Sequence, residues 1–178
     1  MISKRKNEAN QRVRRQIVEA VIELTAEKPL SMISVTELTK RAGVSRMTFY
    51  RNYTSKEEIF SDHLREILTD YRAEEDRLGR TQHYADIENT RRCFNYYTRY
   101  RPFISALFRT DYGHMLLDAI TEYVLDTWRK PESTPAEVYS MHAYAGALYN
   151  CYRAWSKSDF RESVDEMAEI LHRVFIAE

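Results

Sequence analysis

Residues 34–60 constrain the fold of this chain more than any other segment. They read SVTELTKRAGVSRMTFYRNYTSKEEIF and contain two short amphipathic stretches on either side of Gly43. Ser34 stands three residues before Glu37, the spacing of a capping box at a helix start, and Ser45 is placed to cap a second helix. Gly43 suits the end of the first helix, because glycine adopts the left-handed backbone conformation at little cost. The segment therefore predicts two helices joined by a tight turn.

The second helix, expected to run through Arg51, divides its side chains between a buried side and an exposed side. Phe49 is placed to enter the core, while its neighbours carry guanidinium, hydroxyl and thioether groups that suit base edges and phosphates. This division is typical of a helix-turn-helix. The alternative is a plain helical hairpin with solvated basic residues. Such a hairpin does not require a tight turn, helix caps and flanking basic residues to occur together, as they do here. The candidate DNA contacts are Arg46, Met47, Thr48, Tyr50, Arg51, Tyr53 and Lys56.

Charge is distributed unevenly along the 178 residues. Residues 1–60 contain 12 Lys and Arg against 7 Asp and Glu, a net charge of +5, whereas residues 61–178 contain 15 against 20, a net charge of −5. Although the total charge is neutral, residues 1–60 are basic and attract a polyanion, whereas residues 61–178 are acidic. We predict a helix-turn-helix DNA-binding domain over residues 1–54 and a helical regulatory and dimerisation domain over residues 55–178.

An all-α fold follows from the spacing of apolar residues. Only 4 glycines and 4 prolines interrupt the chain, and apolar residues recur at helical rather than alternating intervals. We expect a three-helix DNA-binding head whose first helix follows a loose basic segment at residues 4–7. Asp159 and Glu162 have the spacing to cap a last helix. The other long or medium helices are expected over residues 10–27, 55–78, 84–99, 102–109, 111–128 and 135–157.

Several classes of protein find no support in the sequence. No apolar run approaches the roughly twenty residues that span a bilayer, so we predict a cytoplasmic protein without membrane contact. Cys93 and Cys151 lack partners at metal-binding spacing and are typical of small buried residues in a reducing compartment. Asp62 and His63 resemble a fragment of a metal site whose other ligands have no evident source. We therefore predict no enzyme, no metal and no cofactor.

The chain resembles the TetR family of bacterial transcription regulators. The resemblance rests on the amphipathic first helix, on the run TELTKRAGVSRMTFYRNYTSKEEIF at residues 36–60, and on a helical remainder of suitable length. It implies about nine helices, a dimer formed through the last two long helices, and repression until a small molecule reaches the C-terminal domain. Carried over by position, it places Arg46, Met47, Thr48 and Tyr50 near bases and Thr36, Tyr53 and Lys56 near phosphates.

Met47 departs from the family pattern, because many relatives have glycine at this position. A thioether side chain here replaces a close backbone approach to DNA and is expected to shift operator preference. The alternative is that Met47 packs at the surface of the hairpin.

Aromatic residues concentrate in the C-terminal part of the chain. Eleven of the 13 tyrosines lie at or after Tyr71. Aromatic stripes at helical spacing usually belong to a core or a dimer interface. The alternative is a pocket between helices for a flat or amphipathic ligand, with Arg99 or Arg101 pairing with an acid group. The residues predicted to line such a pocket are Tyr96, Tyr100, Phe103, Phe108, Tyr123 and Trp128.

A small-residue face on the penultimate helix indicates close packing against another helix. Ala143, Gly146 and Ala147 are spaced i, i+3 and i+4, and a mid-helix glycine costs about 1 kcal/mol relative to alanine. The facing helix belongs either to the same chain or to a second copy. With the last helix that the family resemblance adds, the predicted homodimer interface comprises Met141, Ala143, Gly146, Ala147, Leu148, Met167, Ile170, Leu171 and Val174.

These patterns predict a sequence-specific DNA-binding transcription regulator. A two-fold dimer would bind a near-palindromic double-stranded operator. A small-molecule effector held between the middle helices would tilt the helix at residues 55–78 and change the spacing of the two DNA-binding heads. A rival interpretation is a coregulator of the same fold that a protein partner controls, because the motif indicates DNA binding and not what regulates it.

Overall fold

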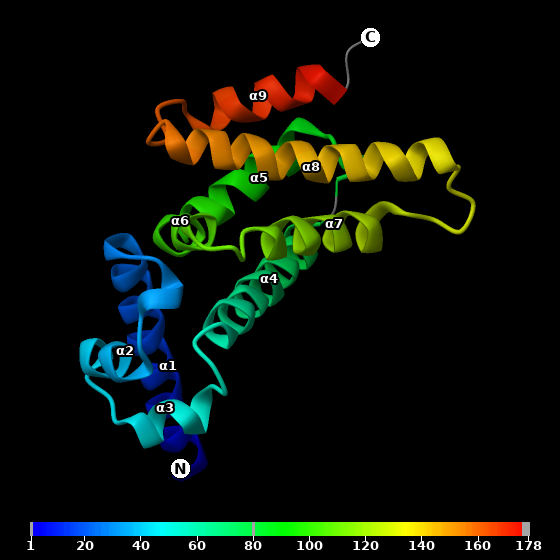
Figure 1. Cartoon of the computed structure of the whole chain (residues 1–178). Coiled ribbons are helices and arrows are strands. Elements are labelled where there is room, and N and C mark those ends of the chain that lie inside the picture. Colours follow the sequence, from blue (N-terminus) through cyan, green and yellow to red (C-terminus); the bar gives the residue numbers. More distant parts are fainter. Residues whose placement is uncertain (1, 80, 176–178) are drawn as a thin grey trace. The chain divides into compact units, whose positions relative to one another are not determined.

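All regular elements in the described part of the chain, residues 2–79 and 81–175 of a computed structural model, are helices (Figure 1). The all-α prediction is confirmed. Within these ranges, every helix is too short or too polar to cross a bilayer. The elements are α1 (Ile2–Glu27), a 3-10 turn η1 (Leu30–Met32), α2 (Val35–Ala42), α3 (Arg46–Asn52), α4 (Glu58–Leu78), α5 (Ile87–Thr98), α6 (Arg101–Arg109), α7 (His114–Trp128), α8 (Pro135–Lys157) and α9 (Val164–Phe175).

The described residues divide into two compact units. The first holds the residues up to 67 together with 105–112, and the second holds 68–104 and the residues from 113 onward. The first unit thus continues past residue 54 into α4. Since α4 spans Glu58–Leu78, one uninterrupted helix runs through both units.

The start of α1 differs from the prediction. The helix begins at Ile2, so residues 4–7, expected to be a loose segment, are helical. The side chains of residues 1–7 lie outside the described part. The charged composition of residues 4–7 does not exclude a helix, since lysine and arginine are good helix formers.

The helix-turn-helix is formed by the predicted caps. The Ser34 hydroxyl accepts a hydrogen bond from the Glu37 amide at 3.1 Å, and the Ser45 hydroxyl accepts one from the Thr48 amide at 3.0 Å. Gly43 ends α2 with a φ of 66°, the left-handed conformation expected of a helix C-cap. The predicted helix starts at Ser34 and Ser45 and the predicted helix end at Gly43 are therefore confirmed.

A small apolar core lies beneath α2 and α3. Helix α1 packs against α2, and the side chains that meet there are fully buried. The members of this core with no exposed surface are Ile17, Val21, Leu24, Leu38 and Phe49. Phe49 is the contribution of α3, so the orientation of this short helix depends on one ring.

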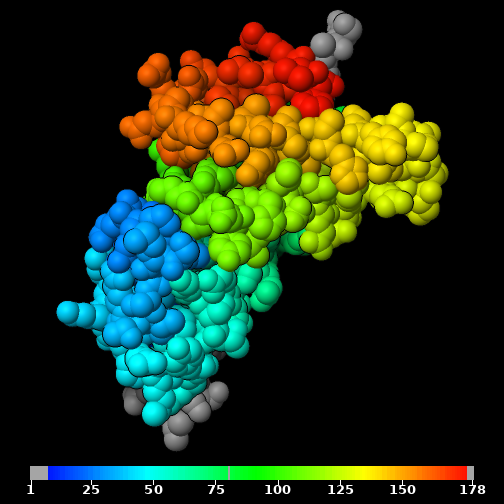
Figure 2. Space-filling model, in the orientation of Figure 1, coloured from blue at the N-terminus to red at the C-terminus, as the bar shows by residue number. Residues whose placement is uncertain are grey.

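The second unit is built from α5, α7, α8 and α9, together with the second part of α4. Helix α7 packs along α8, and α5 packs along α9 (Figure 1). Helix α8 begins with the predicted capping box: Thr134 and Glu137 bond each other's backbone amides at 2.7 and 3.3 Å, with Pro135 in the first turn. On the face shown in Figure 2, α8 and α9 form a continuous surface.

The turn between α8 and α9 corrects the predicted start of the last helix. Asp159 and Phe160 adopt left-handed φ values of 57° and 53°, so they form a turn and not a cap. The capping contacts are made four residues later, where the Ser163 hydroxyl and amide contact the Glu166 carboxylate at 2.8 and 2.7 Å. Both pairs have the same spacing, and the sequence alone did not distinguish them.

Replacing Phe49 by alanine should destabilise the first unit. We expect the Phe49→Ala variant to lose about 3–5 kcal/mol of unfolding free energy, because a fully buried ring is removed from a small core. Met47→Ala is the matched control, since Met47 lies in the same helix and is 74% exposed; its change should stay within about 0.5 kcal/mol. Urea unfolding followed by circular dichroism measures both, and equal losses would contradict this assignment.

Candidate functional site

Helix α3 presents a row of exposed side chains on the surface of the first unit. Met47 is 74% exposed and Tyr50 is 52% exposed, although both are large and partly apolar. Arg46 and Arg51 are exposed beside them, and Thr36 is exposed near the start of α2. An exposed face with cationic, hydroxyl and apolar groups on a helix that is anchored from below can reach base edges and phosphates.

Two local contacts fix side chains within this face. The rings of Tyr50 and Phe49 meet edge to face with their centroids 5.3 Å apart. Because Phe49 is buried, it holds the base of the Tyr50 ring while the rest of that ring remains exposed. The Thr48 hydroxyl lies 2.8 Å from the Ser45 hydroxyl, and Thr48 is only half-buried. Thr48 therefore contributes to the helix cap and still borders the exposed face.

Tyr53 does not join this face. Its side chain is 2% exposed, and its hydroxyl has no hydrogen-bond partner among the described residues. Burial raises the pKa of Tyr53 to about 12. The guanidinium of Arg14 lies over the ring, 5.3 Å from its centroid. A phosphate contact needs an accessible hydroxyl. In this structure Tyr53 is part of the core and is not placed to make the predicted DNA contact.

Lys56 is directed toward the protein backbone. Its ammonium nitrogen donates hydrogen bonds to the carbonyl oxygens of Leu30 at 2.6 Å and Ile33 at 2.9 Å. These carbonyls belong to and follow η1, which leads into α2. Lys56 therefore ties the segment before the helix-turn-helix to the segment after it, a role that its position in the sequence did not indicate.

Arg14 connects α1 to α4 within the first unit. Its guanidinium contacts the Asp62 carboxylate and lies 2.7 Å from the Glu66 carboxylate. Arg14 was not among the residues predicted to contribute to the site. The signal available was the pair Asp62 and Glu66, which are one helical turn apart and can face a single cation.

The Asp62–His63 fragment does not form a metal site. Asp62 pairs with Arg14 and Arg65, and the His63 Nδ1 lies 3.2 Å from the Glu66 carboxylate. Across residues 2–79 and 81–175, no group of three or more His, Cys, Asp or Glu side chains is arranged to hold a metal ion.

The predicted aromatic pocket is largely a packed row of rings. Tyr96 stacks near Tyr100 and Tyr71, with ring centroids 5.4 and 4.9 Å apart, and Tyr123 lies 5.1 Å from Tyr71 and 5.8 Å from Trp128. Tyr71, which was not among the six predicted lining residues, thus contacts two of them, and Tyr100 and Trp128 pack on those two in turn. Their contacts are those of a core.

The other predicted ligand contacts are placed differently. Phe103 is buried, and Phe108 falls in residues 105–112 of the first unit. Arg99, which was a candidate partner for an acidic ligand, forms two hydrogen bonds with the Glu74 carboxylate at 2.8 and 2.9 Å. Arg101 lies over the Phe160 ring at 4.1 Å. Both cations already have protein partners.

Two small cavities lie inside the second unit, each with a volume of about 10 Å³. This volume corresponds to roughly one water molecule, whereas ligand pockets usually measure about 300–1,000 Å³. Of the six predicted pocket residues, only Tyr123 lines either cavity. The first is lined by Tyr71, Asn89, Cys93, Tyr97, Ile120, Tyr123, Val124 and Leu148, and the second by Cys93, Phe94, Tyr97, Ile104, Leu116, Ile120, Leu148 and Tyr152.

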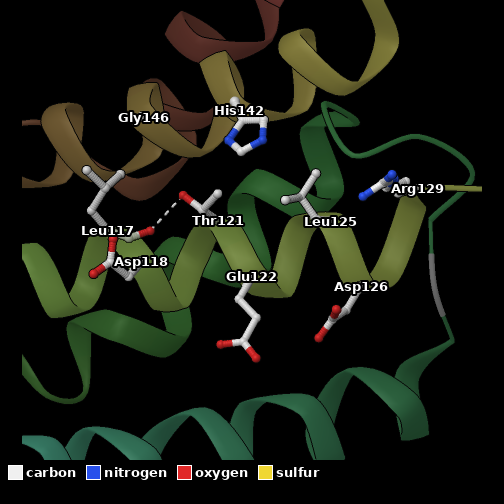
Figure 3. Close-up of a pocket in the computed structure, with 9 residues that line it drawn as sticks. All are labelled: Leu117, Asp118, Thr121, Glu122, Leu125, Asp126, Arg129, His142 and Gly146. Atoms are coloured by element: carbon white, nitrogen blue, oxygen red, sulfur yellow. Dashed lines mark hydrogen bonds between the residues drawn. The ribbon is translucent and has the colours of Figure 1, made fainter. Parts of the chain in front are cut away.

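An open groove of about 690 Å³ lies between α7 and α8 (Figure 3). His142 extends from α8 toward α7, whereas Glu122 and Asp126 point away from α8. Asp126 also lies 3.2 Å from the Arg72 guanidinium. The lining residues are Leu117, Asp118, Thr121, Glu122, Leu125, Asp126, Arg129, His142 and Gly146. The lining is therefore mixed, with leucine, carboxylate, guanidinium and imidazole side chains.

The predicted dimer residues separate into two groups. Met141, Leu148, Met167 and Leu171 are buried within the single chain and serve its own core. Ile170 and Val174 are 50% and 68% exposed, and Ala143, Gly146 and Ala147 are also accessible. A Cβ atom added to Gly146 would meet nothing within 4 Å. Packing inside this chain therefore does not require a glycine there.

The fold and the exposed recognition helix define a helix-turn-helix DNA-binding regulator. A model described as "Bacterial regulatory proteins, tetR family" matches residues 17–62, and one described as "Transcriptional regulator C-terminal region" matches residues 87–177. The second match alone covers more than half of the 178 residues. The chain belongs to the TetR family and is a DNA-binding transcription regulator. The family resemblance predicted from the sequence is confirmed.

Several solved structures share the fold of this chain. A tetR-family transcriptional regulator from Streptomyces coelicolor is 19% identical, with a TM-score of 0.61 over 91% of this chain and 80% of its own. A TetR transcriptional regulator from Rhodococcus sp. RHA1 is 19% identical, with a TM-score of 0.60 over 94% and 98%. The dihydroxyacetone kinase operon activator DhaS is 16% identical, with a TM-score of 0.60 over 93% and 94%. No curated protein matches the sequence.

Tyr53→Phe separates a core role from a phosphate contact. Removal of a buried hydroxyl without a protein partner should raise the unfolding free energy by about 1–2 kcal/mol and leave DNA affinity within about twofold. The variant should also lose less stability than the parent as the pH rises from about 10 to 12, because the raised pKa of Tyr53 opposes ionisation in the folded chain. Weaker DNA binding by Tyr53→Phe would contradict the core role and support the predicted phosphate contact of the Tyr53 hydroxyl.

Proposed function

We propose that this chain is a homodimeric repressor that binds a near-palindromic operator through α3 and is released by a small-molecule effector. One observation carries the DNA-binding part: Arg46, Met47 and Tyr50 are exposed on a helix that the buried Phe49 anchors. Repression is the mode that the family resemblance implies. One similar structure is named an operon activator, so activation is the alternative sign of regulation.

The proposed DNA contacts follow from the accessible groups of the helix-turn-helix. Arg46 lies in the first turn of α3, where a guanidinium reaches guanine edges. The exposed thioether of Met47 suits contact with a thymine methyl group. Lys56 supports the site by holding the η1 segment. The contacting residues in this proposal are Thr36, Arg46, Met47, Thr48, Tyr50 and Arg51.

The homodimer is proposed to form through the accessible surface of α8 and α9. Ala143, Gly146 and Ala147 leave this stretch of α8 without bulky side chains. Ile170 and Val174 expose apolar area on α9. Small residues permit helices to approach closely, and exposed aliphatic residues gain stability when a partner covers them. The proposed interface residues are Ala143, Gly146, Ala147, Ile170 and Val174.

A coregulator controlled by a protein partner is the second candidate function. The observation that favours it is the contrast between the cavities of about 10 Å³ and the open groove of about 690 Å³ between α7 and α8. An open groove with both apolar and charged side chains suits a segment of a partner protein. In both candidate functions, α4 is the connection proposed to transmit the signal, because it runs through both units.

Selection from a random duplex library tests the proposed function. We expect the wild-type chain to enrich a near-palindromic sequence whose half-sites are about one DNA turn apart. Arg46→Ala should relax preference at one base pair in each half-site and weaken binding by about 1–3 kcal/mol. Arg15→Ala, an exposed arginine of α1, is the control for general loss of positive charge and should keep the same consensus. Failure of the wild type to enrich any sequence would contradict operator binding.

Gly146→Leu tests the proposed dimer surface. A Cβ atom at this position meets open space in the single chain and leucine favours a helix more than glycine does, so folding should not be impaired, whereas a second helix packed on Gly146 would be displaced. We expect the dimer dissociation constant in sedimentation equilibrium to rise at least tenfold. Ala73→Leu adds bulk at an exposed position of α4 and should leave self-association unchanged. Equal dissociation constants for both variants and the wild type would show that the dimer interface does not include Gly146.

A further inference from the structure

Met47 is the most exposed large apolar side chain in the described part of the chain, with 74% of its surface accessible. It is the second residue of α3, directly after Arg46. The N-terminal residues of a recognition helix are the ones that contact base edges in the major groove. An apolar side chain at this position gains stability where a base edge offers apolar surface to cover it.

The neighbours of Met47 leave it as the available apolar group at the start of α3. Phe49 is fully buried beneath the helix. The Thr48 hydroxyl lies 2.8 Å from the Ser45 hydroxyl and belongs to the helix cap. Tyr50 is exposed one turn further along, but its hydroxyl both donates and accepts hydrogen bonds. The Met47 thioether donates no hydrogen bond and accepts only weakly, so its contacts are mainly apolar.

Arg46 supplies a polar contact beside this apolar one. Its side chain is exposed and makes no hydrogen bond or ion pair with any of the described residues. Arg41, by contrast, is held by the Glu23 and Glu27 carboxylates at 3.1 and 2.9 Å. A guanidinium without a protein partner is free to bind guanine O6 and N7 in the major groove.

The two side chains are spaced for neighbouring base pairs. Consecutive Cα atoms are about 3.8 Å apart, which is close to the roughly 3.4 Å rise between base pairs. The apolar feature of a base edge in the major groove is the methyl group on C5 of a pyrimidine. Thymine carries this methyl group and so does 5-methylcytosine, whereas uracil and unmodified cytosine lack it.

We propose that Met47 contacts the C5-methyl group of a pyrimidine next to a guanine bound by Arg46, so that cytosine methylation in the operator strengthens binding. A methylated CG step offers the same methyl group and guanine as a TG step. The thioether distinguishes thymine O4 from cytosine N4 only weakly, so the methyl group decides the contact. This inference rests on the proposed function, because it requires α3 to lie in a major groove. It adds DNA methylation as an input to that function.

Exchange of single pyrimidines in the operator enriched from the random library tests the inference. Each pyrimidine beside a guanine in one half-site is varied in turn. Thymine is compared with uracil, and 5-methylcytosine with cytosine. The members of each pair form the same base pair and differ only in the methyl group. In a fluorescence-anisotropy titration, we expect the methylated member to bind about fourfold more tightly at one position, because burial of one methyl group changes affinity by about this factor.

Substitutions test whether Met47 makes the contact. Met47→Ala should reduce both preferences for the methyl group to less than about twofold, whereas Met47→Leu keeps an apolar side chain of similar size and should retain them. Met32→Ala is the matched control, since Met32 is 68% exposed but belongs to η1, and it should keep the wild-type preferences. Wild-type preferences in Met47→Ala would overturn the role of Met47.

The outcomes separate this inference from the proposed function. An enriched operator that binds equally well with and without each methyl group would overturn the inference and keep the regulator. An enriched operator without any pyrimidine beside a guanine would do the same. No enrichment of an operator by the wild-type chain would contradict the proposed function, and the inference would fall with it.

Discussion

The burial of Phe49 is the interaction on which the DNA-binding surface depends. Helix α3 has only seven residues, too few to be stable in isolation, so its orientation must come from tertiary contacts. Phe49 provides the buried contact, in a core that α1 and α2 complete. The Ser45 cap then fixes where the helix begins. Because the Phe49 ring is buried, the neighbouring side chains of α3 lie on the surface. From there they can contact the major groove of DNA.

The sequence predicted this part of the structure because its signals are local. Ser34, Gly43 and Ser45 act on hydrogen bonds within a few residues, so their effect is visible without knowledge of the fold. Tyr53 and Lys56 required more. Burial of Tyr53 depends on Arg14, and the bonds of Lys56 depend on the carbonyls of η1. The sequence shows that the Tyr53 hydroxyl and the Lys56 ammonium suit a phosphate contact. It does not show that the folded chain places both groups against other parts of the protein.

The C-terminal unit was predicted less completely for the same physical reason. The periodicity that identifies α8 and α9 does not say whether an apolar residue faces its own chain or a second copy. Met141 and Leu148 face the chain's own core, whereas Ile170 and Val174 remain accessible. Tyrosine rings suit a ligand pocket and a core equally well, and in this structure they pack on one another through Tyr71.

We propose that two copies of α3, each anchored by Phe49, occupy successive major grooves of one DNA duplex. Protection of guanine N7 atoms from methylation in the protein–DNA complex tests it most directly, because N7 lies in the major groove. We expect two protected blocks on one face of the duplex, with centres about one helical turn apart. A single protected block, or full methylation of every guanine despite tight binding, would contradict it.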